Sequence, residues 1–137
     1  MNRMDLQELS KLRSLETAVL IDNKSFDGAY YLCGYSAEFG LKACIAKRTR
    51  EFDFFDKKTA NDSFTHELMK LVRVAELEKD LSCEISNNEE FSLNWNLAKE
   101  WTEASRYERC SERKATQLYK AINDKQFGIM SWIKKYW

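Results

Sequence analysis

Apolar residues recur every three or four positions along most of this chain, and that spacing predicts helices. A first helix is expected from about residue 4 to residue 22. The segment "DNKSFDG" interrupts the pattern, and a second helix is expected to begin near Ser25 or Asp27, both favourable N-cap residues, and to end near Arg50. Its central part, residues 30–46, reads "YYLCGYSAEFGLKACIA" and contains only two charged residues, Glu38 and Lys42. We expect this helix to be buried at the centre of the domain.

The second half of the chain shows weaker patterns. Residues 51–63, "EFDFFDKKTANDS", and residues 78–90, "EKDLSCEISNNEE", are polar enough to predict loops. Between them a third helix is expected, capped by Ser63 or Thr65. A fourth helix is predicted from Phe91 through Ser105, and a last helix from about residue 110 to residue 124, with helical spacing continuing through the tail "WIKKYW" (132–137).

The composition favours a single all-α domain over residues 1–137. The chain has no proline and four glycines, which removes most of the turn residues that all-β folds need. Hydrophobic residues make up 44% of the sequence, enough for one core in a chain of this length. No internal repeat or linker divides the chain.

The charge balance and the first residues of the chain bear on what the protein binds and where it is located. The 22 basic residues balance 22 acidic ones, so no global attraction to nucleic acid or to an anionic membrane is predicted. The first residues, "MNRMDLQELSKLRSLE", lack the apolar region of a signal peptide, and Glu38 and Lys42 oppose a membrane span over residues 30–46. We therefore expect a cytoplasmic protein that does not enter the membrane.

The cysteine and histidine content predicts neither a metal site nor a cofactor. The four cysteines form no Cys-x-x-Cys pair, and His66 is the single histidine. Cys33 and Cys44 lie eleven residues apart on the same predicted helix, about 16 Å along its axis, which is too far for a disulfide. Reduced thiols are expected.

The second helix has a polar face. At 100° per residue, Tyr31, Tyr35, Glu38 and Lys42 share one side, while Cys33, Ala37, Gly40 and Cys44 form a stripe of small side chains on the opposite side. Burying an acid and a base is costly unless further hydrogen bonds satisfy them, and the two tyrosines are placed to supply hydroxyls. This face is either a structural network or a functional site.

Two later segments supply further candidates. His66 opens the predicted third helix in "FTHEL", and Arg106 and Tyr107 fall where the fourth helix should end in "EWTEASRYE". Each also has an ordinary explanation, His66 as a capping or surface residue and Arg106 as a cation at a helix C-terminus.

The segment "AYYLCGYSAEFGLKACIAKR" strongly resembles the HEPN domains, the nucleotide-binding domains of higher eukaryotes and prokaryotes. It matches their G-Y-x-x-E-x-x-L-K pattern through Gly34, Tyr35, Glu38, Leu41 and Lys42. "THELMKL" is similar to the family's His-x-L-x-x-L segment, and "WTEASRY" to its Arg-Tyr segment, in the same order. The resemblance covers roughly residues 20–137.

The resemblance implies an up-and-down bundle of about five helices, often a homodimer, often paired with a nucleotidyltransferase or antitoxin in a toxin-antitoxin or phage-defence module. Many HEPN proteins are metal-independent endoribonucleases with an arginine followed by a histidine after four to six residues. That motif is absent, because no arginine stands at the required distance before His66 and no histidine follows Arg106.

Three hypotheses follow from the residues and the resemblance together. The leading one is a noncatalytic HEPN domain that binds a nucleotide, RNA or a partner protein through Tyr35, Glu38, Lys42, His66, Arg106 and Tyr107. In it Lys42 and Arg106 face phosphate, a tyrosine contacts a base or ribose, and Glu38 holds Lys42 in place. The second is a ribonuclease toxin with His66 as the base and Arg106 as the charge stabiliser. The third is a structural interaction module that uses the small-residue stripe or the tail "WIKKYW" as its contact surface.

Overall fold

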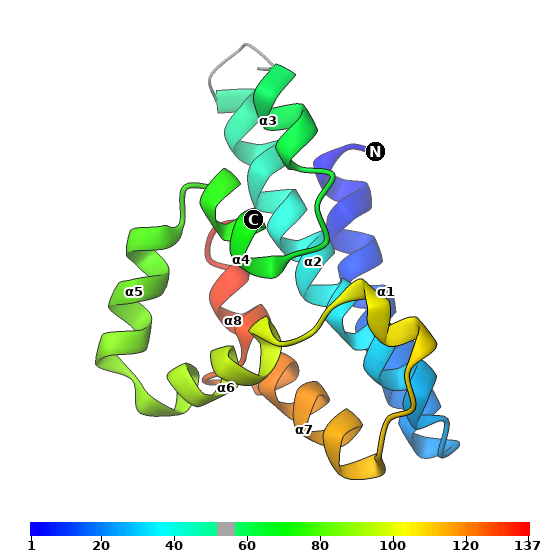
Figure 1. The fold of residues 1–137 in the computed structure, drawn as a ribbon. Coiled ribbons are helices and arrows are strands. Elements are labelled where there is room, and N and C mark those ends of the chain that lie inside the picture. The colour runs from blue at the N-terminus through cyan, green and yellow to red at the C-terminus, as the bar shows by residue number, and fades with distance from the viewer. Residues whose placement is uncertain (52–56) are drawn as a thin grey trace.

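The computed structural model describes residues 1–51 and 57–137, and these residues form helices and no strands (Figure 1). The elements in chain order are α1 (Arg3–Asp22), α2 (Phe26–Glu51), α3 (Lys57–Asp62), α4 (Leu68–Val74), α5 (Glu78–Asn87), α6 (Glu89–Lys99), the 3-10 helix η1 (Glu103–Tyr107), α7 (Glu112–Asn123) and α8 (Ile129–Ile133). The all-α prediction is confirmed. The expected number of about five helices is wrong, since the described residues contain eight α-helices, several of them only two turns long or less.

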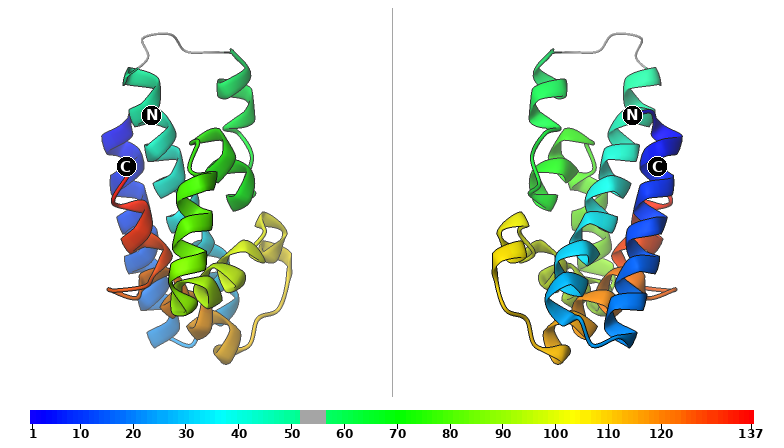
Figure 2. Two further views of the ribbon diagram at one scale, coloured as in Figure 1. Left: turned by 90° about the vertical axis from the view of Figure 1, so that its left-hand side faces the viewer. Right: turned by 90° about the vertical axis from the view of Figure 1, so that its right-hand side faces the viewer.

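The two longest helices, α1 and α2, lie side by side as a helical hairpin (Figures 1 and 2). Asn2 caps α1 by accepting a hydrogen bond from the backbone N–H of Asp5, and the Asp5 carboxylate accepts one from the N–H of Asn2 in return. Lys24, with φ at 59°, ends the helix in a left-handed turn, and the N–H of Ser25 donates to the carbonyl of Leu20. Both predicted helices are confirmed to within about two residues.

Helix α2 is the central element, packed against α1, α4, α7, α8 and η1. Its small-residue stripe faces α8: a Cβ added at Gly40 would lie 3.0 Å from Cε of Met130, and the Cys44 thiol lies 3.8 Å from the carbonyl of Ile133. Cys33 and Cys44 are buried free thiols, as expected. The stripe is therefore covered within the chain, and the suggestion that it serves as an external contact surface is wrong.

The expected loop at residues 78–90 is instead α5 followed by the start of α6. Asn88 separates them, because it ends α5 and its side chain accepts a hydrogen bond from the N–H of Phe91 in α6. Leu81 is the one α5 residue that is buried, so the segment lacks the apolar stripe that would have revealed a helix. Part of the other expected loop is also helical, as α3, while residues 52–56 lie outside the described residues.

The expected third and fourth helices have different bounds. Helix α4 begins at Leu68, later than either predicted cap, because Thr65 accepts a hydrogen bond from the N–H of Glu67 and holds a turn there. Helix α6 ends at Lys99, and the predicted continuation to Ser105 is a break followed by η1. Both changes leave His66 and Arg106 outside α-helices, on connecting segments that can reach α2.

The tail of the chain completes the core. Helix α7 matches the predicted last helix to within two residues, and Gly128 then allows a close turn into α8, since a Cβ there would lie 2.3 Å from the carbonyl of Asp124. Trp132 and Ile133 are buried, so most of the apolar surface of "WIKKYW" packs inside the molecule. The expectation that this tail is a contact surface is therefore wrong for its apolar part.

Candidate functional site

The site begins with one buried acid on α2. The side chain of Glu38 is 1% exposed, and the ammonium of Lys42, one turn further along, lies 2.8 Å from its Oε1 atom. A buried carboxylate with a single ion pair would still lack hydrogen bonds to its second oxygen and would destabilise the fold. Glu38 therefore needs a second partner from outside α2.

His66 is that partner. Its Nδ1 atom lies 3.0 and 3.1 Å from the two carboxylate oxygens of Glu38, although the residues are 28 positions apart in the sequence. The turn at Thr65 that delays α4 places the imidazole over α2. The sequence indicated each residue separately, and the structure brings them into direct contact.

The short helix η1 adds the third segment. The carboxylate of Glu103 lies 3.1 Å from Nε2 of His66 through one oxygen, and 3.5 Å from Nη1 of Arg106 through the other. We call Lys42, Glu38, His66, Glu103 and Arg106 the Glu38 cluster. Its members form a continuous row in which basic and acidic side chains alternate, from the partly buried Lys42 through the fully buried Glu38 to the half-exposed Arg106.

His66 connects the two acids of the row. Its Nδ1 atom shares a hydrogen bond with the buried carboxylate of Glu38, and its Nε2 atom lies 3.1 Å from the carboxylate of Glu103. An imidazole has one nitrogen on each side of the ring, so a single side chain can contact both acids.

Aromatic rings surround this row. Tyr35 packs edge-on against His66 and Trp101, with ring centroids 5.9 and 5.2 Å away. Burial is the main cause that raises the pKa of Tyr35 well above its usual range, so this phenol stays neutral. The expectation that both tyrosines donate to the Glu38–Lys42 pair is wrong, because the Tyr31 hydroxyl donates to that of Tyr35 at 3.4 Å and His66 occupies the place beside Glu38.

Arg106 and Tyr107 form the outer edge. The guanidinium carbon of Arg106 lies 4.7 Å from the ring centroid of Tyr107, which is largely exposed. Tyr107 is the first cause that raises the pKa of Arg106, so the guanidinium keeps its charge. Tyr107 joins the site through Arg106, whereas the other predicted residues contact the row directly.

Two residues of the site were not predicted from the sequence. Glu103 links His66 to Arg106, and its one sequence signal is the i, i+3 spacing of an acid and a base in "EASR". Trp101 lies flat against α2, where a Cβ added at Gly34 would come within 1.9 Å of its ring. Its indole N–H and the hydroxyl of Ser105 are buried without a hydrogen-bond partner in the described part of the chain.

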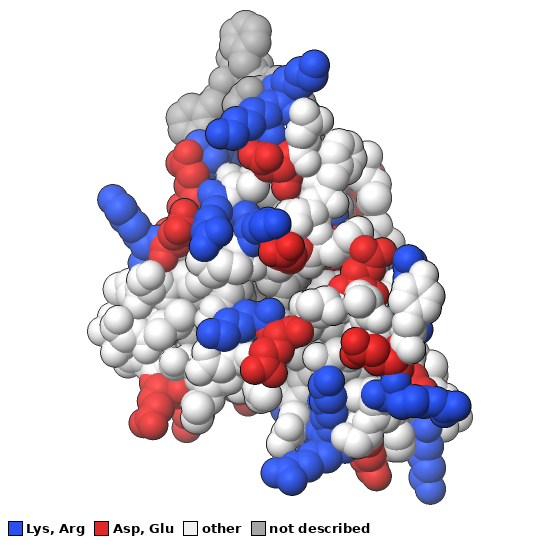
Figure 3. Space-filling model, viewed as in Figure 1, with Lys and Arg blue, Asp and Glu red and all other residues white. Residues whose placement is uncertain are grey.

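Residues 1–51 and 57–137 contain neither a metal-binding cluster nor a helix that could cross a membrane. No group of histidines, cysteines and carboxylates there has the arrangement to hold a metal ion. None of the described helices has both the length and the apolar character needed to cross a membrane. On the face seen in Figure 3 acidic and basic side chains are interspersed rather than gathered by sign. That face therefore offers no broad surface of one charge sign.

Comparisons with protein-family models, curated proteins and solved structures found no match to this chain.

Proposed function

We propose that this chain is a noncatalytic HEPN-like domain that binds a phosphate-bearing ligand, a nucleotide or an RNA segment, at the Glu38 cluster. One observation carries the proposal: three segments far apart in the sequence meet in one row of contacts. Lys42 and His66 contact the buried carboxylate of Glu38, and Arg106 contacts Glu103, which in turn contacts His66. Burying Glu38 costs free energy that a purely structural helix contact would avoid by using apolar residues. A binding role gives the buried acid a use that a purely structural contact does not require.

Each residue has a distinct role in this proposal. Glu38 orients Lys42 and His66, while the exposed end of the row supplies the charge that a phosphate meets. The contact between Glu103 and Arg106 is 3.5 Å long and partly exposed, so it contributes little stability and an incoming anion can replace it. Phosphate would then bind Arg106 and Nε2 of His66, and Tyr107 would stack on a base.

Calorimetry with adenosine and uridine 5′-monophosphates and a short single-stranded RNA tests this function. We expect R106Q to weaken binding at least tenfold, about 1.4 kcal/mol. The matched control is R109Q, three residues on, where the arginine is almost fully exposed and lies 3.8 Å from Asp27. The absence of heat with every probe, or an equal loss in R109Q, would contradict the proposal.

A metal-independent ribonuclease is the second candidate, and one contact favours it. A buried carboxylate on Nδ1 of His66 orients the ring and leaves Nε2 toward the surface, as in catalytic pairs where the carboxylate stabilises the charged imidazole. Nε2 must first leave Glu103 and lose its proton to activate a ribose 2′-hydroxyl. Cleavage of tRNA or single-stranded RNA that disappears in H66A and R106A would establish this activity, and cleavage indifferent to both changes would exclude it.

The resemblance also suggests partners, and these remain proposals. A homodimer, and a nucleotidyltransferase or antitoxin partner in a toxin-antitoxin or phage-defence module, would each need a surface. Large apolar side chains are exposed along the outer side of α1, and these are Met4, Leu12, Leu15 and Val19. They lie within an arc of about 80° on the helix and offer a continuous face to a second chain.

A further inference from the structure

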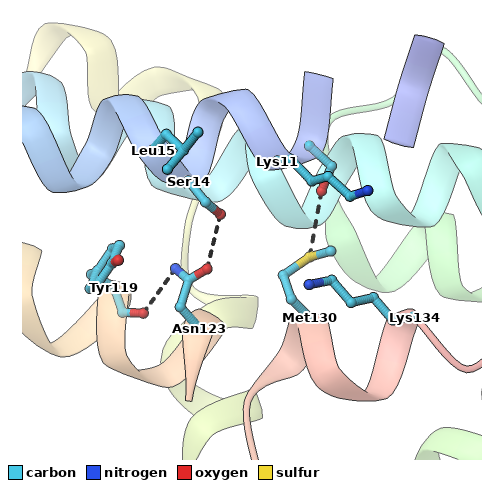
Figure 4. A pocket seen from close by; sticks show the side chains of 8 residues that line it. Lys11, Ser14, Leu15, Tyr119, Asn123, Met130 and Lys134 are labelled. Carbon is cyan, nitrogen blue, oxygen red and sulfur yellow. Dashed lines mark hydrogen bonds between the residues drawn. The ribbon is translucent and has the colours of Figure 1, made fainter. Parts of the chain in front are cut away.

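A pocket of about 260 Å³ lies between α1, α7 and α8, and it shares no residue with the Glu38 cluster (Figure 4). Its volume is slightly below that of typical small-molecule sites, so a ligand with few atoms would fill it. The three helices come from opposite ends of the chain. The pocket therefore exists only in the folded molecule.

One end of this pocket is positively charged. Lys11 from α1 and Lys134, which follows α8, stand at the same end of the pocket in Figure 4. Each ammonium lies 5.7 Å from the ring centroid of Trp137, so the two charges are at most twice that distance apart. Neither lysine has an ion pair with a carboxylate in the described residues. Two like charges share one aromatic ring, and an anion bound between them would relieve their repulsion.

The remaining walls are neutral and held in place. The Ser14 hydroxyl donates to Oδ1 of Asn123 at 2.9 Å, and Nδ2 of Asn123 donates to the carbonyl of Tyr119 at 3.1 Å. The first bond ties α1 to α7, and the two bonds together fix the amide of Asn123. Leu15 and Met130 add apolar surface beside them. The pocket thus has a cationic end and a neutral body in which the apolar surfaces of Leu15 and Met130 lie beside polar groups.

We propose that this pocket binds a small phosphomonoester with a compact apolar or aromatic body. The two ammonium groups balance the dianionic phosphate, since lysine contacts phosphate as a point charge without the fixed geometry of arginine. The body lies against Leu15, Met130 and the ring of Tyr119. This site is independent of the proposed function at the Glu38 cluster.

Phenyl phosphate is the probe, titrated into the full chain while the indole N–H resonance of Trp137 is followed by NMR. We expect a saturable shift, with a dissociation constant at least tenfold lower than that of inorganic phosphate because the phosphate ion lacks the apolar body. K11Q and K134Q should each raise the dissociation constant for phenyl phosphate at least tenfold. Both lysines are exposed, so these variants should fold normally.

Two controls separate the outcomes. K125Q removes an exposed lysine outside the pocket, and R106Q changes the Glu38 cluster, so neither should alter the saturable shift that phenyl phosphate produces at Trp137. No saturable shift up to about 10 mM probe would overturn the proposal. Equal weakening in K125Q would overturn it too, because binding would then follow net charge rather than this pocket. Loss in R106Q with normal binding in K11Q would place the phosphate at the Glu38 cluster and also overturn it.

Discussion

Glu38 is the residue on which the candidate site depends. Its carboxylate is almost completely buried and contacts two basic side chains that are themselves partly exposed, Lys42 and His66. Replacing the acid by a neutral amide removes the counter-charge of Lys42 and one acceptor for His66, although each side chain can recover some hydration. The buried acid therefore contributes both to stability and to the position of these two side chains.

For E38Q we predict a loss of about 2 to 3 kcal/mol in the free energy of unfolding, measured by urea denaturation. The matched control is E16Q on α1, which removes an i, i+3 partner of Arg13 at the surface and should change stability by less than about 0.5 kcal/mol. Similar losses of stability in the two variants would mean that the buried Glu38 carboxylate stabilises the fold no more than a surface acid does.

The pKa of Tyr30 gives a second prediction for a single residue, on how the stability of the protein depends on pH. Burial is the first cause that raises its pKa to about 12, from an ordinary value near 10. Above pH 10 the unfolded chain loses this proton while the folded chain retains it, so the contribution of Tyr30 is complete below pH 10 and is lost as pH rises toward 12. We predict that Y30F reduces the fall in stability between pH 10 and 12 by at most about 3 kcal/mol.

Urea denaturation at a series of alkaline pH values measures this effect. Y107F serves as the control, because Tyr107 is largely exposed. If the free energy of unfolding of Y30F falls with pH as steeply as that of the native chain, then ionisation of Tyr30 does not cause the loss of stability between pH 10 and 12.

At the scale of elements, the predicted helix bounds are most accurate where the residues of the helix itself show a helical pattern. Helices α1 and α7 have side-chain N-caps, and α2 has a long apolar run. The predicted bounds of all three are close to the observed ones. The sequence does not predict α5, because Leu81 is the one residue of that helix that is buried. It predicts that the preceding α-helix continues into η1, because Trp101 and Ser105 keep a four-residue spacing across the break between them. Short elements are decided by contacts with distant parts of the chain, which local spacing does not contain.

The same distinction holds for the candidate site. Counting along α2 was enough to place Glu38 beside Lys42, because an i, i+4 pair depends on helix geometry alone. The contacts of His66 with Glu38 and with Glu103 join separate segments, and no local pattern indicates them. The sequence therefore supplied the candidates and only part of their arrangement.

The packing of Trp101 on Gly34 connects α2 to η1 and gives a prediction at this scale. A methyl group at Gly34 would lie 1.9 Å from the indole, so G34A must displace Trp101 and with it the segment that carries Glu103 and Arg106. We predict a loss of about 2 kcal/mol in stability and weaker nucleotide binding. Urea denaturation and calorimetry measure the two effects.

G28A is the matched control on the same helix. The added Cβ would lie 3.6 Å from Cδ1 of Leu20, an ordinary contact, so a gain of about 0.5 kcal/mol is expected from the better helix propensity of alanine. A G34A variant as stable as G28A, with native nucleotide binding, would show that η1 does not depend on this contact.

At the scale of the whole molecule, the outer face of α1 bears on the proposed homodimer. L12E and V19E together place two charges on its exposed apolar residues. We predict that light scattering gives the native chain twice its mass of 16.2 kDa, and the double variant 16.2 kDa. L93E changes an exposed apolar residue of α6 and should leave the dimer intact. A native monomer, or a dimer that survives both charges on α1, would contradict this assignment.

The central claim is that a phosphate-bearing ligand binds beside His66, and the single histidine of the chain makes a direct measurement possible. In protein labelled with ¹⁵N-histidine, the ring nitrogen signals report on this one site without interference from another histidine. We predict that adenosine 5′-monophosphate shifts the Nε2 signal saturably in the native chain and in R109Q, but not in R106Q, as phosphate replaces Glu103. Nucleotide binding detected by calorimetry without any change at His66, or no binding at all, would contradict the claim.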